Sequence, residues 1–266
     1  MKRIIFIIIA MVLVALIATS AYFILSHHLE AKRATDLYKK IADIAEKDTE
    51  PSDKKSSDNN NSNRKLRLIN PKILSVSGYT KLKVKNSDMV GWVKIDGTRI
   101  NYPVMHTPSK PDFYLYRAFD KSYSIYGCPY LQDNCDLNRP SDNFIIYGHH
   151  MNDGSMFSDL VKYTSKDFYN SHKIIHFNTV TEKRDYEVIA AFSTSVNEGK
   201  GFRYFDFVNA YGSEDYGSYI KSVKKISYYD TGKSAEFGDK LITLSTCEYT
   251  HSNGRMVVVA KQLTRR

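Results

Sequence analysis

The last part of the chain contains two strand-like runs joined by a polar loop, and this pattern constrains the fold more than any other. Residues 241–246 and 256–260 are rich in β-branched and aliphatic side chains, which favour strands. The loop between them holds an Asn-Gly pair at 253–254, a strong turn signal. If the strands pair, Cys247 and Arg255 lie at the same end of a sheet, where a thiol and a fixed cation can serve one site.

The preceding part of the chain alternates short strand-like runs with a few helical patterns. Strands are predicted at residues 92–95, 98–104, 143–147, 174–177 and 186–195, and helices at residues 79–86, 156–169 and 212–226. Many short strands with few helices predict a mainly β fold. We expect an antiparallel β-barrel with helices inserted in its connections and at the start of the domain.

The N-terminus carries an apolar run, residues 4–25, that contains no charged residue. Its length of about twenty residues suits a membrane-spanning helix. Lys2 and Arg3 precede it, so the positive-inside rule places the N-terminus in the cytoplasm and the rest of the chain outside. A cleaved signal peptide is the alternative, with a weak small-residue site at residues 18–20. The apolar run continues past that site, which favours an uncleaved anchor over residues 1–28.

A helical stalk and a polar linker are predicted between the anchor and the folded domain. Apolar residues recur every three or four positions in residues 29–47, with charges between them, as in an amphipathic helix. Residues 49–64 contain no apolar residue and cannot bury enough surface to order themselves. We therefore assign residues 29–65 to a stalk and flexible linker, and residues 66–266 to one folded domain outside the membrane.

Charge and cysteine content exclude some classes of protein. The net charge is +9, but the basic residues are scattered and form no nucleic-acid motif, so no nucleic-acid partner is expected. Of the three cysteines, Cys128 and Cys135 can pair with each other or remain as buried thiols, and the thiol form is favoured. No Cys-x-x-Cys or His-x-x-x-His spacing occurs, so we expect neither a metal nor a cofactor.

A catalytic thiol needs a proton-transfer partner and donors for the oxyanion that forms when it attacks a peptide carbonyl. His149 follows a compact apolar strand and can serve as the acid and base for Cys247. Arg255 offers several fixed N–H donors to a developing negative oxygen. His150 is the rival base, but adjacent residues of a strand face opposite ways, so only one histidine is expected to reach the thiol.

Three further residues form the predicted substrate-binding set. Ser245 precedes Cys247 by two positions and shares its face of the strand, so its hydroxyl can bond the substrate or serve the structure alone. Thr246 and His150 complete this set. The alternative to a catalytic role is a structural one. Cys247 would then be a buried structural cysteine, and Arg255 a solvated residue at a strand end.

Several motifs in the chain resemble those of the sortases, the membrane-anchored cysteine transpeptidases of Gram-positive bacteria. Residues 243–247 read Thr-Leu-Ser-Thr-Cys and match the family's Thr-Leu-x-Thr-Cys signature, and Gly148-His149 matches its histidine motif. Arg255 opens the next strand, as the family's arginine does. Two further stretches resemble class B sortases in particular. They are residues 86–104 and the His-His pair with the residues that follow it, 151–157. The resemblance covers residues 79–263.

This resemblance implies an eight-stranded sortase-type β-barrel and a defined reaction. The enzyme would cleave a C-terminal sorting signal, of Asn-Pro-x-Thr or a related Pro-x-Thr type, after its threonine. A thioacyl-enzyme would form, and a secreted surface protein would pass to an amine of the cell-wall peptide or its lipid-linked precursor. The implied location is the cell membrane, with the catalytic domain facing the wall.

Three other classes of protein remain open from the residues alone. A thiol hydrolase of the same fold would use water as the acceptor, because both reactions share the acyl-enzyme. A phosphatase also uses a cysteine, a loop and an arginine, but its loop needs converging N–H groups and several glycines, and only Gly254 is present here. A tethered wall-binding module without activity would not be inactivated by a thiol-alkylating reagent.

Overall fold

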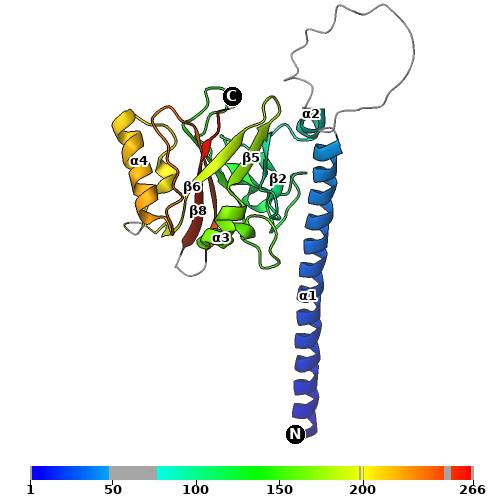
Figure 1. Cartoon of the computed structure of the whole chain (residues 1–266). Coiled ribbons are helices and arrows are strands. Elements are labelled where there is room, and N and C mark those ends of the chain that lie inside the picture. Colours follow the sequence, from blue (N-terminus) through cyan, green and yellow to red (C-terminus); the bar gives the residue numbers. More distant parts are fainter. Residues whose placement is uncertain (1, 48–76, 198, 200, 249–252, 265–266) are drawn as a thin grey trace, which may run out of the picture. The chain divides into compact units, whose positions relative to one another are not determined.

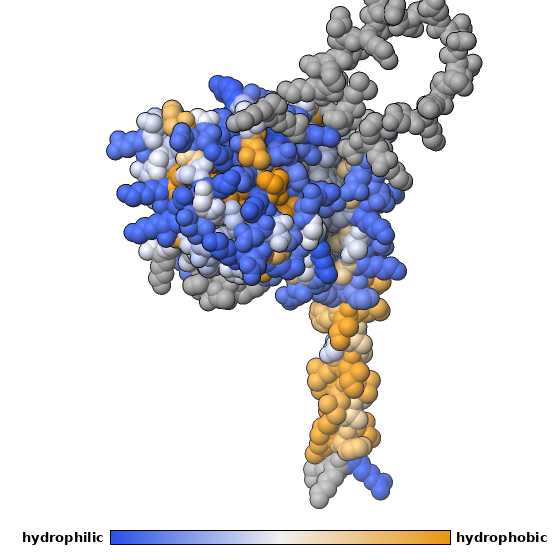
Figure 2. Space-filling view, in the orientation of Figure 1, coloured by the Kyte–Doolittle hydropathy of each residue, from blue (hydrophilic) through white to orange (hydrophobic). Residues whose placement is uncertain are grey.

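The computed structural model describes residues 2–47, 77–197, 199, 201–248 and 253–264, in two compact units, Met1–Lys40 and Ile41–Arg266. Helix α1 (Lys2–Lys47) supplies the first unit and confirms the helix predicted at residues 29–47. It is long and apolar enough to cross a membrane, its most apolar 18-residue stretch has a mean hydropathy of 3.0, and the large apolar side chains of residues 4–25 are exposed (Figures 1 and 2). The predicted linker and the boundary at residues 65–66 lie outside the described residues.

The second unit, shown in Figure 1, is built on a closed barrel. Its strands follow the order β1-β2-β3-β4-β7-β8-β6-β5. This confirms the predicted mainly β fold with eight strands. The strands are β1 (Met89–Lys94), β2 (Asn101–Met105), β3 (Tyr130–Leu131), β4 (Asn143–Tyr147), β5 (Ile174–Thr179), β6 (Asp185–Ser195), β7 (Leu241–Glu248) and β8 (Gly254–Gln262).

The barrel is mixed, so the expectation of a wholly antiparallel sheet is wrong. Strand β4 pairs in parallel with β7 from Asn143↔Leu241 to Tyr147↔Ser245, and β2 pairs in parallel with β3. A parallel pair needs a long crossover connection, and the segment from β4 to β7 provides one, since it includes β5, β6 and α4. The predicted closing pair is confirmed, with β7 and β8 antiparallel.

Helical segments fill the connections between the strands, as predicted. They are α2 (Ser77–Lys85), η2 (Phe113–Tyr116), η3 (Ser158–Thr164), α3 (Lys166–Ser171), η4 (Tyr204–Asp206) and α4 (Ser213–Ile226). The single helix predicted at residues 156–169 is wrong. Ser165 interrupts it in an extended conformation, and its hydroxyl accepts from the Phe168 amide to cap α3. Helix α4 buries one apolar face beside β6 (Figure 1).

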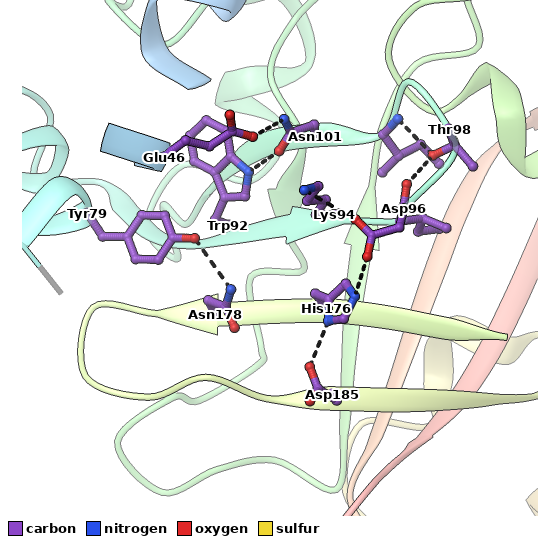
Figure 3. A network of polar contacts seen from close by, with 12 residues as sticks. Glu46, Tyr79, Trp92, Lys94, Asp96, Thr98, Asn101, His176, Asn178 and Asp185 are labelled. Carbon is purple, nitrogen blue, oxygen red and sulfur yellow. Dashed lines mark hydrogen bonds and ion pairs between the residues drawn. The ribbon is translucent and has the colours of Figure 1, made fainter. Parts of the chain in front are cut away.

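The outer side of β1 and β5 is held by polar contacts around a buried tryptophan (Figure 3). Trp92 is only 3% exposed, donates to Asn101 at 2.6 Å and stacks on Tyr79 of α2, so it is covered and not free in solvent. Nearby, His176 lies between two carboxylates, with Nδ1 2.7 Å from Asp185 and Nε2 3.2 Å from Asp96. These contacts join β1, β2, β5 and β6 through side chains as well as through the sheet.

A buried asparagine ties β4 to its parallel neighbour and to the chain before α4. The side chain of Asn143 is fully buried, and its Nδ2 donates to the Phe207 carbonyl at 2.9 Å. Its Oδ1 accepts from the Thr243 hydroxyl at 2.9 Å. Both the nitrogen and the oxygen of the Asn143 amide are thus hydrogen-bonded at the start of β4. These bonds fix where the strand begins, and its other end leads to the candidate site.

We predict that Asn143→Ala lowers the free energy of unfolding by about 1–3 kcal/mol, because it removes the buried hydrogen bonds to the Phe207 carbonyl and the Thr243 hydroxyl. Equilibrium denaturation measures the change. Asn138→Ala is the control, since Asn138 is exposed, and it should shift stability by less than about 0.5 kcal/mol. Equal shifts for the two variants would show that the Asn143 amide does not hold β4.

Candidate active site

The pairing of β4, β7 and β8 brings the three predicted catalytic residues to one end of the barrel. Tyr147 pairs with Ser245 in the parallel ladder, and His149 and Cys247 each follow two residues later. Cys247 in turn pairs with Arg255 in the antiparallel ladder. The three side chains line one cavity of about 550 Å³. Residues far apart in the sequence therefore meet at one site.

The imidazole of His149 is held by a backbone carbonyl. Its Nε2 lies 2.6 Å from the Leu115 oxygen in η2. A carbonyl oxygen only accepts hydrogen bonds, so Nε2 carries the hydrogen, and in the neutral ring Nδ1 keeps the lone pair. The half-exposed ring of Tyr116 lies 5.8 Å from the His149 ring, between centroids. The arrangement leaves Nδ1 as the proton-accepting atom.

His150 makes a different contact from its neighbour. Its Nδ1 lies 3.0 Å from the carbonyl oxygen of Cys247 and donates to it. His150 does not belong to the residues that line the cavity in the described part of the chain, whereas His149 does. The two neighbouring histidines thus make different contacts, and only His149 lines the cavity among the described residues.

Gly148 lets β4 pass close to an aromatic ring just before His149. Its amide donates to the Ser245 carbonyl at 3.1 Å, which extends the parallel ladder toward the site. A Cβ at this position would lie 2.6 Å from a ring carbon of Phe157. The Phe157 amide also donates to the His149 carbonyl at 2.9 Å. Phe157 therefore fixes the backbone of His149 and leaves no room for a side chain at Gly148.

The two predicted substrate-binding residues of β7 are buried. The hydroxyl of Ser245 lies 2.7 Å from the Tyr204 hydroxyl of η4, so it is already bonded. Burial raises the pKa of Tyr204 to about 12, and the phenol stays protonated at neutral pH. The Thr246 hydroxyl is buried and has no hydrogen-bond partner within the described residues. Both residues line the cavity.

Arg255 and Cys247 are both half-buried at the cavity wall. One guanidinium nitrogen of Arg255, Nη1, donates to the Gly254 carbonyl at 3.0 Å, which anchors the side chain at the start of β8. A guanidinium has five N–H donors, so this bond leaves others for a ligand. A fixed cation beside a thiol suits an anion that forms next to the sulfur.

Sequence reasoning missed the residues that build the opposite wall. Gln132 accepts from the Tyr147 hydroxyl at 2.5 Å and donates to the Phe205 carbonyl at 3.0 Å, which joins β4 to η4. Tyr130 of β3 donates to Asp112 at 2.7 Å. All five line the cavity. Apart from Tyr147, which ends the predicted strand at residues 143–147, they lie in short segments without a motif, and the topology brings them together.

Cys128 and Cys135 are buried thiols, which confirms the favoured prediction, and the alternative disulfide between them is not formed. Cys135 Sγ lies 3.6 Å from the Asn143 carbonyl, and burial raises the pKa of this thiol to about 12. Cys128 lies at the cavity wall, with its Sγ 3.7 Å from the Pro103 carbonyl. The part of the chain that the structure describes holds no cluster of three His, Cys, Asp or Glu for a metal.

Comparisons with known proteins agree on one family. The sortase domain family matches residues 93–263. Sortase B of Staphylococcus aureus is 34% identical over 185 residues, covering 69% of this chain and 73% of the relative. Sortase B of Listeria monocytogenes is 34% identical over 187 residues, with the same shares covered. The S. aureus sortase B–substrate complex matches with a TM-score of 0.73 at 27% identity, covering 90% of this chain and 100% of that one.

The chain therefore belongs to the sortase family, whose members are cysteine transpeptidases. Both relatives and the structural neighbour are class B sortases, which confirms the resemblance drawn from the motifs. The closed mixed barrel with helices in its connections is the fold of those structures.

We predict that Gly148→Ala lowers the turnover of a sorting-signal peptide by at least about tenfold, because the added methyl pushes Phe157 and the His149 backbone apart. Steady-state kinetics on the folded variant measures the loss. Gly217→Ala in α4 is the matched control, since a Cβ there meets nothing within 4 Å. Its turnover should equal that of the parent, and a comparable loss in the control would contradict the explanation.

Proposed function

We propose that this chain is a membrane-anchored class B sortase that cleaves a C-terminal sorting signal after threonine and transfers the protein to a cell-wall amine. The signal would be of the Asn-Pro-x-Thr type or a related Pro-x-Thr type. The observation that carries the proposal is the convergence of Cys247, His149 and Arg255 on one cavity through the β4–β7–β8 register.

Acylation would use the thiol and the imidazole in sequence. Cys247 passes its proton to Nδ1 of His149, and the thiolate sulfur attacks the carbonyl carbon of the signal's threonine. The C–N bond then breaks, and His149 returns the proton to the leaving amine. The product is a thioester between the threonine carbonyl and Cys247. The bond from Nε2 to Leu115 supports this role, because it keeps Nδ1 free to exchange the proton.

Transfer would reverse these steps with a new amine. The amine of a wall peptide or of its lipid-linked precursor attacks the thioester carbonyl and gives a proton to His149. The C–S bond breaks, and His149 passes that proton to the departing sulfur, which restores the thiol of Cys247. In both steps Arg255 would donate N–H groups to the oxyanion on the carbonyl. Water in place of the amine would give the hydrolase reaction, the alternative outcome.

Substrate binding is assigned to residues beside the thiol. We propose that Thr246 bonds the signal peptide, because its hydroxyl is buried at the cavity without a partner in the described part of the chain. Ser245 would act through its bond to Tyr204, which holds η4 against the cavity. His150 would hold the backbone of Cys247 in place through its bond to the Cys247 carbonyl.

The phosphatase alternative does not suit the geometry. A phosphate-cradling thiolate needs a loop of backbone N–H groups at a helix N-terminus. Here Cys247 and Arg255 are paired residues on two strands. The proposed location is the cell membrane, with the N-terminus inside and the domain outside, supported by the apolar helix α1 and the basic residues before it.

The decisive experiment incubates the chain with candidate signal peptides, with and without an amine acceptor, and reads the products by mass spectrometry. We predict cleavage after threonine, a covalent adduct on Cys247 and acceptor-dependent ligation. Cys247→Ala should abolish all three while the fold is kept, because no other group supplies the thiolate. Turnover by folded Cys247→Ala protein would rule out the covalent route, and cleavage without ligation would favour the hydrolase.

We predict that His149→Ala lowers kcat/KM for the peptide by at least about a thousandfold, whereas His150→Ala lowers it by about tenfold or less. The difference arises because His149 lines the cavity, while His150 bonds the backbone of Cys247. Kinetics on the two variants side by side measures it. The reverse order would assign the proton transfer to His150.

A further inference from the structure

A hydrogen bond at the cavity wall links β3 to the segment that holds His149. The Tyr130 hydroxyl donates to Oδ1 of Asp112 at 2.7 Å. Asp112 directly precedes η2, and the Leu115 carbonyl of η2 lies 2.6 Å from His149 Nε2. Within η2, the Leu115 amide donates to the Asp112 carbonyl at 2.9 Å. The phenol is therefore connected to the imidazole through one short segment of backbone.

We infer that Asp112 and Tyr130 are positioning residues for His149: their hydrogen bond holds η2 so that the Leu115 carbonyl keeps the proton of the imidazole on Nε2. The inference rests on the proposed function for the role of His149, and it adds how that ring is held. Neither residue belongs to a motif of the sequence, and neither is a member of the predicted site.

The backbone of Asp112 shows why the segment needs a bond at this point. Asp112 has φ 59° and ψ 11°, a left-handed conformation that residues with a Cβ adopt only at a cost, although Asp and Asn tolerate it best. Its side chain does not cap η2, which is the usual use of an aspartate before a helix. The carboxylate instead turns to Tyr130, so the bond stabilises a turn that the backbone alone disfavours.

Residues 127–128 pack closely against the carbonyl oxygens of η2. A Cβ on Gly127 would lie 2.5 Å from the Leu115 oxygen and 2.6 Å from the Tyr114 oxygen. The Cys128 amide donates to the Tyr114 carbonyl at 3.0 Å. Residues 127–128 thus lie against the carbonyl oxygens of η2, and Asp112 with Tyr130 fixes its first turn. The Leu115 oxygen is left with little freedom to move away from His149.

The charges around the pair favour the same arrangement. Burial, and then the Asp112 carboxylate, raise the pKa of Tyr130 well above its ordinary value. Arg255 lowers this pKa and Cys247 raises it, both by weaker effects. The phenol therefore stays protonated throughout the neutral range and acts as a donor to Asp112. An ordinary substrate contact would not require Asp112 to adopt the left-handed conformation.

The test has two measurements, both on the full chain in detergent. Spectra are recorded without peptide on protein labelled with ¹⁵N in its histidines, and kinetics are measured with the peptide. Long-range ¹H–¹⁵N spectra report which ring nitrogen of His149 carries the proton, and a His149→Gln sample assigns the signal. The parent should show the Nε2–H form. Tyr130→Phe removes only the hydroxyl and should give a mixture of the two forms, together with a kcat for peptide about tenfold lower and a KM within about twofold.

Substitutions at Asp112 separate the hydrogen bond from the backbone conformation. Asp112→Asn keeps an acceptor and the left-handed preference, so its kcat should stay within about threefold of the parent. Asp112→Gly keeps the conformation but loses the acceptor, so it should match Tyr130→Phe. The double variant should be no worse than either single one, because the two residues act through one bond. Additive losses would overturn the inference.

Tyr126→Phe is the matched control, since Tyr126 donates to the carboxylate of Asp153 at 2.9 Å. It should leave the His149 signal and kcat unchanged. A raised KM with an unchanged kcat and His149 signal in Tyr130→Phe would make Tyr130 a substrate contact and overturn the inference. If the parent cleaves no peptide, the proposed function fails, yet the spectra still show whether the pair sets the proton on Nε2.

Discussion

The parallel pairing of β4 with β7 is the constraint on which the rest of the structure depends. It places the ends of two strands that are far apart in the sequence side by side, one followed by His149 and the other carrying Cys247. The ladder continues to Gly148, and Asn143 fixes where it begins. A shift of one residue would turn the thiol to the other face of its strand. The register of this pair therefore decides whether thiol and imidazole share a cavity.

Much of the fold followed from local sequence patterns. Alternating and β-branched runs located β4, β6, β7 and β8, and the strands predicted at residues 92–95 and 98–104 located β1 and β2. The parallel order of β4 and β7 was missed, because side-chain periodicity gives no direction for pairing over long distances. The break at Ser165 was also missed, since the apolar spacing continues across it and only a cap reveals the second helix.

The candidate site was predictable where a motif was present and hidden elsewhere. Cys247, His149 and Arg255 stand out by residue type and by their place at strand ends, and the structure brings all three to one cavity. Gln132, Tyr130 and Asp112 contribute through contacts with residues from other segments, which no local pattern records. The carbonyl that holds His149 is a backbone atom, so no residue type could indicate it.

The long separation between β4 and β7 also affects how the chain folds. Native contacts between distant residues require the closure of large loops, and chains rich in such contacts fold slowly. Here β5, β6 and α4 all lie between the two strands in the sequence. Hairpins such as β1–β2 and β7–β8 join neighbouring strands of the chain, whereas the β4–β7 pair requires the closure of a long loop. The thiol and its histidine are therefore brought together by one of the long-range pairings of the barrel and not by any local hairpin.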